Sequence, residues 1–293
     1  MPLWIPFVVF AAFMQSWRNA FQKQLSYKKV PVFGVTLARF IMAAPMAALY
    51  LFFLHAWRPI PLPAVSAKWA VLVFFASIAQ IIATSLMVQV FQLKNYAMGV
   101  GLAKSEAVIA AVLGVIWFNA PLSFWGWVGV VMGGVAVLLM SGVHSFRAFP
   151  FKTVALGLGS GLSFALTSLW VREASLDLGM PFPHSAAWVL LAVLTLQTLL
   201  LGLWLLLRDL AALKALLRQP LLMFLTSLAS FLGSVGWFTA MSLEKVPLVK
   251  TLGQVEIFFT LLISFFWFNE KLNKKDIGGF VLIAVAVICV VLA

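Results

Sequence analysis

Ten apolar runs, each about as long as a membrane-spanning helix, account for most of this chain. A helix needs about 20 residues to cross the hydrocarbon core of a bilayer. The runs, bounded by charges, prolines or glycine clusters, lie at 4–25, 31–54, 69–92, 96–118, 124–142, 153–175, 184–207, 219–242, 247–268 and 275–293. The longest connecting segments, 55–68 and 208–219, are too short for a soluble domain. The sequence therefore predicts an all-α polytopic membrane protein with ten transmembrane helices.

The composition agrees with lipid as the solvent. Of the 293 residues, 64% are hydrophobic and 10% are charged, whereas a soluble domain is about half apolar and about a quarter charged. A net charge of +12 would indicate nucleic-acid binding in a soluble protein. Here the basic residues fall mostly in short gaps, where they act as topology signals and headgroup contacts. We therefore expect a multi-pass protein of a cell membrane, of the bacterial inner-membrane type, that contacts the bilayer and no nucleic acid.

The second half of the chain repeats the first, 150 residues further along. The segment 104–122 aligns with 254–272, so that Glu106 falls on Glu256. The same offset aligns serine- and threonine-bearing positions upstream and a proline near the start of each half. A chance match of short apolar segments would not keep one register over most of the chain.

Each half contains five predicted helices, an odd number, so the second half enters the membrane in the opposite sense. Such inverted repeats place a binding site near the bilayer midplane, between the halves. We predict a first five-helix repeat at 1–142, a connecting loop at 143–152 and a second repeat at 153–293 around a central cavity. Most lysines and arginines follow odd-numbered helices, which predicts both termini outside.

A short motif, Asn269-Glu270-Lys271-Leu272 followed by Gly278-Gly279, lies at the start of the last predicted helix. The first half has Asn119-Ala120-Pro121-Leu122 instead, without the glutamate. Together with the repeat, this motif resembles the EamA branch of the drug/metabolite transporter superfamily. The resemblance covers nearly the whole chain. It implies a basket of ten helices around a central cavity that exports small metabolites, often amino acids or related compounds. It also implies cytoplasmic termini, against the loop charges.

Glu106 and Glu256 lie near the centres of two predicted helices. A charge there costs about 2.5–3.5 kcal/mol on insertion scales and usually faces protein or a water-filled cavity. Small residues share a helical face with each glutamate, and such faces permit close helix approach. Both carboxylates are therefore predicted to point inward. They either bind a substrate amine or exchange protons, or they are held by a structural partner such as Arg18 or Arg39.

Lys104 stands two residues before Glu106, about 200° around a helix. We therefore expect no simple ion pair between Lys104 and Glu106. The repeat places Gln254, polar but uncharged, opposite Lys104. Lys104 either receives a substrate carboxylate or extends toward the headgroups, and Gln254 joins it as a binding candidate.

The first predicted helix carries a polar stripe, formed at helical spacing by Gln15, Arg18, Asn19, Gln22 and Ser26. A polar face inside a membrane span needs cavity water or another polar helix. Arg18 is thus either a fixed positive charge at the site or a partner in an ion pair that only locks the bundle. Gln15 and Asn19 are substrate-binding candidates on the same face.

Three further candidates come from other spans: Arg39, Gln80 and Trp237. Arg39 has the same two interpretations as Arg18. Gln80 belongs to a stripe of hydroxyl-bearing residues that otherwise serve to hold helices together. Trp237 either lines the cavity or faces lipid.

These features favour a secondary transporter over an enzyme. His55, His144 and His184 fall in or beside loops, there is one cysteine, and no phosphate-binding glycine loop occurs, so neither a metal site, a catalytic group nor ATP-driven transport is expected. No cofactor is predicted. A passive channel or a structural membrane protein remains the alternative class.

The predicted mechanism is alternating access around a midplane site, with Glu106 and Glu256 as candidates for proton coupling or another ion as the driver. Arginine and lysine opposite two glutamates favour an amino acid or related zwitterion as the small-molecule substrate. A small organic anion is the alternative, because basic groups outnumber acidic ones. A monomer is compatible with the sequence, which leaves the oligomeric state open.

Overall fold

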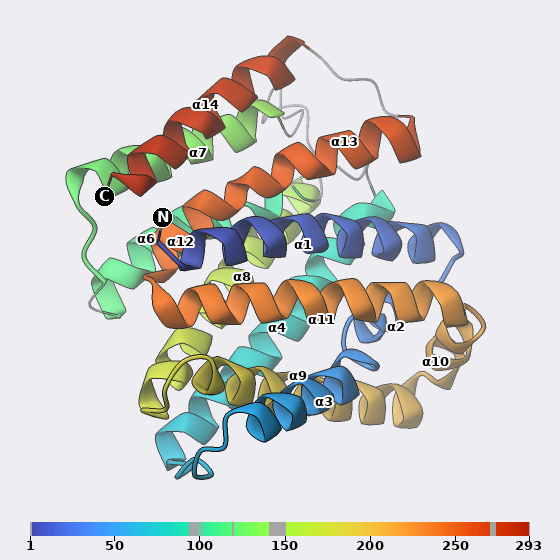
Figure 1. The fold of residues 1–293 in the computed structure, drawn as a ribbon. Coiled ribbons are helices and arrows are strands. Elements are labelled where there is room, and N and C mark those ends of the chain that lie inside the picture. The colour runs from blue at the N-terminus through green and yellow to red at the C-terminus, as the bar shows by residue number, and fades with distance from the viewer. Residues whose placement is uncertain are drawn as a thin grey trace.

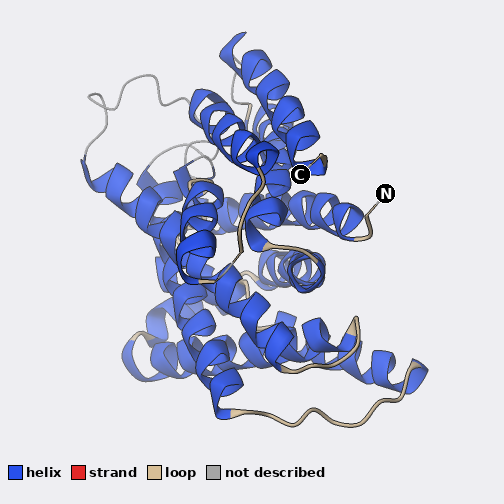
Figure 2. Cartoon of the chain, turned by 90° about the vertical axis from the view of Figure 1, so that its left-hand side faces the viewer, coloured by secondary structure: helices blue, strands red, loops and turns tan. Residues whose placement is uncertain are grey.

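The computed structural model describes residues 2–93, 100, 102–118, 120–140, 151–269 and 274–292. All regular secondary structure in this part of the chain is helical (Figure 2). The helices are α1 (Trp4–Tyr27), α2 (Val32–Ala38), α3 (Ala43–Trp57), α4 (Ala67–Leu93), α6 (Glu106–Trp117), α7 (Phe124–Met140), α8 (Phe151–Asp177), α9 (His184–Arg208), α10 (Leu210–Leu217), α11 (Pro220–Leu243), α12 (Val246–Leu252), the 3-10 helix η2 (Gly253–Val255), α13 (Glu256–Phe268) and α14 (Lys274–Val291).

The chain is an all-helical membrane protein. Among the described residues, six helical segments are long and apolar enough to cross a bilayer: Val32–Trp57, Ala67–Leu93, Phe151–Asp177, His184–Arg208, Pro220–Leu243 and Val246–Phe268. Helix also occupies the described parts of the other ranges in which the sequence predicts it.

Two predicted features fall mostly or wholly outside the described residues. The connecting loop predicted at 143–152 overlaps the described chain only at its last two positions. The Glu270-Lys271-Leu272 motif and Asn119 are not described either. The predicted loop at 208–219, by contrast, is wrong in part, because α10 forms there. The Asp209 carboxylate caps α10 by accepting a hydrogen bond from the Ala212 N–H at 3.0 Å.

Helices of the first half pack along helices of the second. The tightest neighbours are α1 with α11, α4 with α8, and α7 with α14, and α3 lies along α9 (Figure 1). The contact between α1 and α11 is especially close at Gly236, where an added Cβ would lie 2.7 Å from the Phe7 carbonyl oxygen. This close approach brings the middle of α11 against the polar stripe of α1.

The span predicted at 31–54 is present as the apolar segment Val32–Trp57, but its helix is interrupted between α2 and α3, a break that the sequence did not predict. Pro45 lacks an N–H and cannot donate to the Ile41 carbonyl. The Ser227 hydroxyl of α11 inserts into the helical ladder. It donates to the Ala38 carbonyl at 2.7 Å and accepts from the Met42 N–H at 3.2 Å. Those are the two groups that an unbroken helix would pair with each other.

Candidate functional site

Both predicted site glutamates begin a helix that follows a break. Glu106 is the first residue of α6, after a turn at Lys104 and Ser105, and Glu256 is the first residue of α13, after η2. The predicted span at 247–268 is present as the apolar segment Val246–Phe268, and regular α-helix is interrupted within it, as it is within the span predicted at 96–118. A carboxylate suits a helix N-terminus, because the free N–H groups and the helix dipole favour negative charge there.

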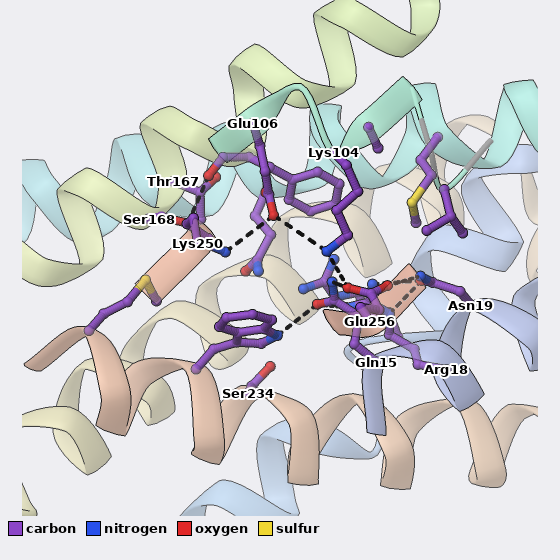
Figure 3. A pocket seen from close by; sticks show the side chains of 18 of the residues that line it. Gln15, Arg18, Asn19, Lys104, Glu106, Thr167, Ser168, Ser234, Lys250 and Glu256 are labelled. Atoms are coloured by element: carbon purple, nitrogen blue, oxygen red, sulfur yellow. Dashed lines mark hydrogen bonds and ion pairs between the residues drawn. The ribbon is translucent and has the colours of Figure 1, made fainter. Parts of the chain in front are cut away.

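The fully buried Glu256 carboxylate collects donors from α1 and from the segment before α6. The Asn19 amide donates to Glu256 Oε1 at 2.9 Å, and the Gln15 amide and the Lys104 ammonium donate to Oε2 (Figure 3). The predicted polar stripe of the first helix thus faces a carboxylate of the other half.

Gln15 and Asn19 also connect Glu256 to two further groups. The Arg18 guanidinium donates to Asn19 Oδ1 at 2.6 Å and to Gln15 Oε1 at 3.3 Å. The Trp237 indole donates to the same Gln15 oxygen at 2.8 Å. Each amide therefore accepts from a donor on one side and donates to Glu256 on the other. Arg18 is therefore connected to Glu256 through the neutral amides of Gln15 and Asn19.

Glu106 lies between two ammonium groups. Its Oε1 is 3.6 Å from Lys250 Nζ and 3.9 Å from Lys104 Nζ. The expectation that Lys104 and Glu106 form no ion pair is wrong, since the turn at Lys104 replaces the helical geometry on which it depended. Lys250 Nζ also lies 4.3 Å from the centre of the Trp237 ring, a favourable cation–π position.

Lys250 was not among the predicted site residues, because it lies near the start of the helix predicted at 247–268, where lysine normally extends to the headgroups. Lys104 precedes its own glutamate by two residues and Lys250 precedes Glu256 by six, which is one helical turn more. The 150-residue alignment therefore paired Lys104 with Gln254 and hid the second lysine. In space each lysine pairs with the glutamate of the other half: Lys104 with Glu256 and Lys250 with Glu106. Lys250 lies four residues, about one helical turn, before Gln254, so a search for basic residues one turn from the aligned position would have found Lys250.

Arg39 and Gln80 lie near the two glutamates, among the residues that line the same cavity. Arg39, beside the break between α2 and α3, donates to the Thr84 hydroxyl at 2.6 Å. Gln80 of α4 accepts a hydrogen bond at 2.6 Å from the amide of Gln197 on α9. Gln197 is fully buried and was not predicted, because a lone glutamine in an apolar span carries no pattern.

One cavity between the two halves is lined by all of the predicted site residues except Gln254. The predicted residues are Gln15, Arg18, Asn19, Arg39, Gln80, Lys104, Glu106, Trp237 and Glu256, joined by Lys250 and by apolar and hydroxyl side chains. Its free volume of about 30 Å³ has room for about two water molecules. The charged side chains therefore nearly fill it, and the cavity is closed to any larger ligand in this conformation.

Gln254 points elsewhere. Its side chain is fully buried and packs against Gly133 of α7, where an added Cβ would lie 1.8 Å from Gln254 Oε1. Neither polar atom of its amide has a hydrogen-bond partner. The structure thus places Gln254 at the packing contact with α7 and outside the cavity.

Charge in the cavity is unbalanced. Four basic side chains (Arg18, Arg39, Lys104 and Lys250) and two glutamates line it, a formal difference of +2. All six are at least nine-tenths buried, and ionisable groups within a membrane protein mark a functional site by default. Within the described residues, no cluster of three or more His, Cys, Asp or Glu side chains offers a metal position.

Comparisons with known proteins agree with this arrangement. The model of the EamA-like transporter family matches residues 2–142 and again residues 151–292. A solved crystal structure is similar over 98% of this chain and 96% of its own, with a TM-score of 0.69 and 14% sequence identity; at that identity the likeness shows the fold alone. No curated protein matches the chain. With the family model covering almost the whole length twice, the chain belongs to the EamA-like transporter family of the drug/metabolite transporter superfamily, and is a transporter and not an enzyme.

Proposed function

We propose that this protein is a secondary transporter that exports small organic anions across the bacterial inner membrane by alternating access of the central cavity. The observation that carries the proposal is the crosswise pairing of Lys104 with Glu256 and of Lys250 with Glu106. These pairs close the cavity by joining the two halves. Opening the cavity to either side must separate or rearrange them.

Ten crossings in two inverted five-helix repeats are part of this proposal. The helix pairing supports it. Numbered by predicted span, the first packs along the eighth and the third along the sixth, which are equivalent contacts if the halves are exchanged by a two-fold axis. The fifth span packs along the tenth and the second along the seventh, so that each of these spans contacts its equivalent in the other half. A midplane site between inverted repeats is the arrangement on which alternating access depends.

The charges of the cavity support an anion over a zwitterion. Both glutamates are already ion-paired with a lysine, so a substrate ammonium would have to displace one. The excess of two basic side chains, in contrast, is offset by an anionic substrate. A substrate anion would compete with Glu106 and Glu256 for the two lysines. Protonation of a glutamate would release its lysine in the same way, which is a direct route for proton coupling.

Reconstitution in liposomes tests the proposal with a panel of labelled organic anions, amino acids and amines. We expect saturable uptake of at least one organic anion, stimulated by a pH gradient. Lys104→Gln should reduce that flux at least tenfold, and Glu106→Gln or Glu256→Gln should remove the stimulation. Lys28→Gln, at an exposed position outside the cavity, is the matched control and should transport normally.

Three outcomes would count against the proposal. Flux that rises linearly with concentration would indicate a channel. Uptake of amines but of no anion would reverse the substrate class. Unchanged flux and proton coupling in both glutamate variants would exclude these carboxylates from the coupling step.

A further inference from the structure

Lys104 and Lys250 are each paired with a glutamate, whereas in the described chain no carboxylate lies within salt-bridge distance of Arg39. Its side chain is 2% exposed and lines the cavity. One terminal nitrogen donates to the Thr84 hydroxyl, and Nε–H has no partner. A buried cation with an unused donor is costly. This guanidinium therefore retains the capacity to bind an anion.

The fold fixes Arg39 in this position. It lies at the break between α2 and α3 that Ser227 holds open through the Ala38 carbonyl and the Met42 N–H. The Phe164 ring centre is 5.6 Å from the guanidinium carbon. Aromatic contact lowers the cost of holding the charge here but supplies no hydrogen-bond acceptor.

Gln80 is oriented so that it offers a donor to the cavity. The Gln197 amide nitrogen lies 2.6 Å from Gln80 Oε1 and 3.5 Å from the Ser77 carbonyl oxygen. The Ser77 carbonyl only accepts, so the nitrogen of Gln197 must face this way. Gln80 consequently turns its oxygen toward Gln197. Its NH₂ group is left for the cavity that it lines.

We propose that Arg39 and Gln80 form the subsite for a carboxylate of the transported metabolite, with Gln197 as a positioning residue. The assignment rests on the proposed function, which it refines. A guanidinium and an amide NH₂ present N–H donors to two oxygens, and guanidinium–carboxylate pairs are among the stronger hydrogen-bonded contacts. Lys104 and Lys250 are paired with glutamates and Arg18 donates to Asn19 and Gln15, whereas Arg39 keeps an unpartnered Nε–H for a substrate carboxylate.

The test measures the thermal midpoint of the full-length protein in detergent, with sodium acetate, succinate, phosphate or chloride at equal ionic strength. We expect acetate and succinate to raise the wild-type midpoint. Arg39→Gln should abolish that rise, yet raise the midpoint without added carboxylate, because a buried charge without a salt-bridge partner is removed. Arg39→Lys should bind more weakly, and Arg58→Gln, at an exposed arginine, should behave as wild type.

Gln197→Leu tests the positioning role. It should raise the succinate concentration for half-maximal shift about three- to tenfold, the effect of one hydrogen bond. A purely structural role would lower the midpoint and leave that concentration unchanged.

The absence of any carboxylate shift in the wild type, or a full shift in Arg39→Gln, would overturn the assignment. A larger shift with phosphate than with succinate would overturn the choice of carboxylate. Failure of transport with the shift intact would count against the proposed function and leave the subsite standing.

Discussion

Replacing Glu256 by Gln is expected to abolish the stimulation of transport by a pH gradient and to destabilise the protein. The buried Glu256 carboxylate accepts from Lys104, Gln15 and Asn19. Removing one partner of a buried ion pair costs about 3–5 kcal/mol, because the other charge is left uncompensated. We expect the lower end, about 3 kcal/mol, since Glu106 lies 3.9 Å from the Lys104 ammonium and takes over part of its charge.

Thermal unfolding and liposome flux, measured on the same preparation, check this expectation. Glu173→Gln is the matched control, because Glu173 is half-buried on α8 and does not line the cavity. The control should be close to wild type in both measurements. Wild-type stability in Glu256→Gln would contradict the importance of the ion pair. Reduced stability with normal stimulation of flux by a pH gradient would restrict that pair to a structural role.

Lys250→Glu is expected to have a still larger effect on folding. It removes a cation from the face of Trp237 and places a second carboxylate where an ammonium now lies 3.6 Å from Glu106. Two buried like charges in contact destabilise each other, and Glu106 keeps only the more distant of its two ammonium partners, Lys104 at 3.9 Å. We expect a severe loss of folded protein, visible as a collapsed yield of monodisperse material in detergent.

The charge-exchanged double variant Glu106→Lys with Lys250→Glu should recover most of that yield. Residues in direct contact show coupling energies of about 0.5–3 kcal/mol in double-mutant cycles, and this pair is buried, so the upper part of that range is expected. Combining Lys250→Glu with Lys28→Gln, which is exposed and distant from the cavity, should give no recovery. Strictly additive effects of the two exchanged positions would show that Lys250 and Glu106 do not stabilise one another across the halves.

Much of the fold follows from the sequence, because apolar length is a strong signal in a membrane. The helix that begins at Trp4 and the one that begins at His184 start at or within a residue of where the apolar runs predict. The interruptions within the helices cannot be predicted from the local sequence, since an interruption depends on groups that are distant in sequence. Ser227 and Ala38, for example, are 189 residues apart. Within residues 31–54, nothing near the break apart from Pro45 indicates that a hydroxyl will insert there.

The candidate site could likewise be predicted only in part from the sequence. The polar stripe of α1 and the repeated glutamates were visible, because polar residues at helical spacing in an apolar run are rare. Lys250 was hidden by its nearness to a helix end, where lysine normally extends to the headgroups. Gln254 was predicted by symmetry alone, and symmetry of sequence does not fix the rotation of a side chain after a stretch of 3-10 helix.

Accessibility of the cavity from the two sides of the membrane tests the central claim most directly. Cys289 is the only cysteine, so a Cys289→Ser background accepts a single thiol at Ser234, which lines the cavity. Ser175→Cys, buried on α8 away from the cavity, is the control. Alternating access predicts that a charged, membrane-impermeant thiol reagent labels position 234 from either side, that a transported anion slows the labelling, and that position 175 stays unlabelled. Labelling of position 234 from one side only, or from neither, would contradict the account.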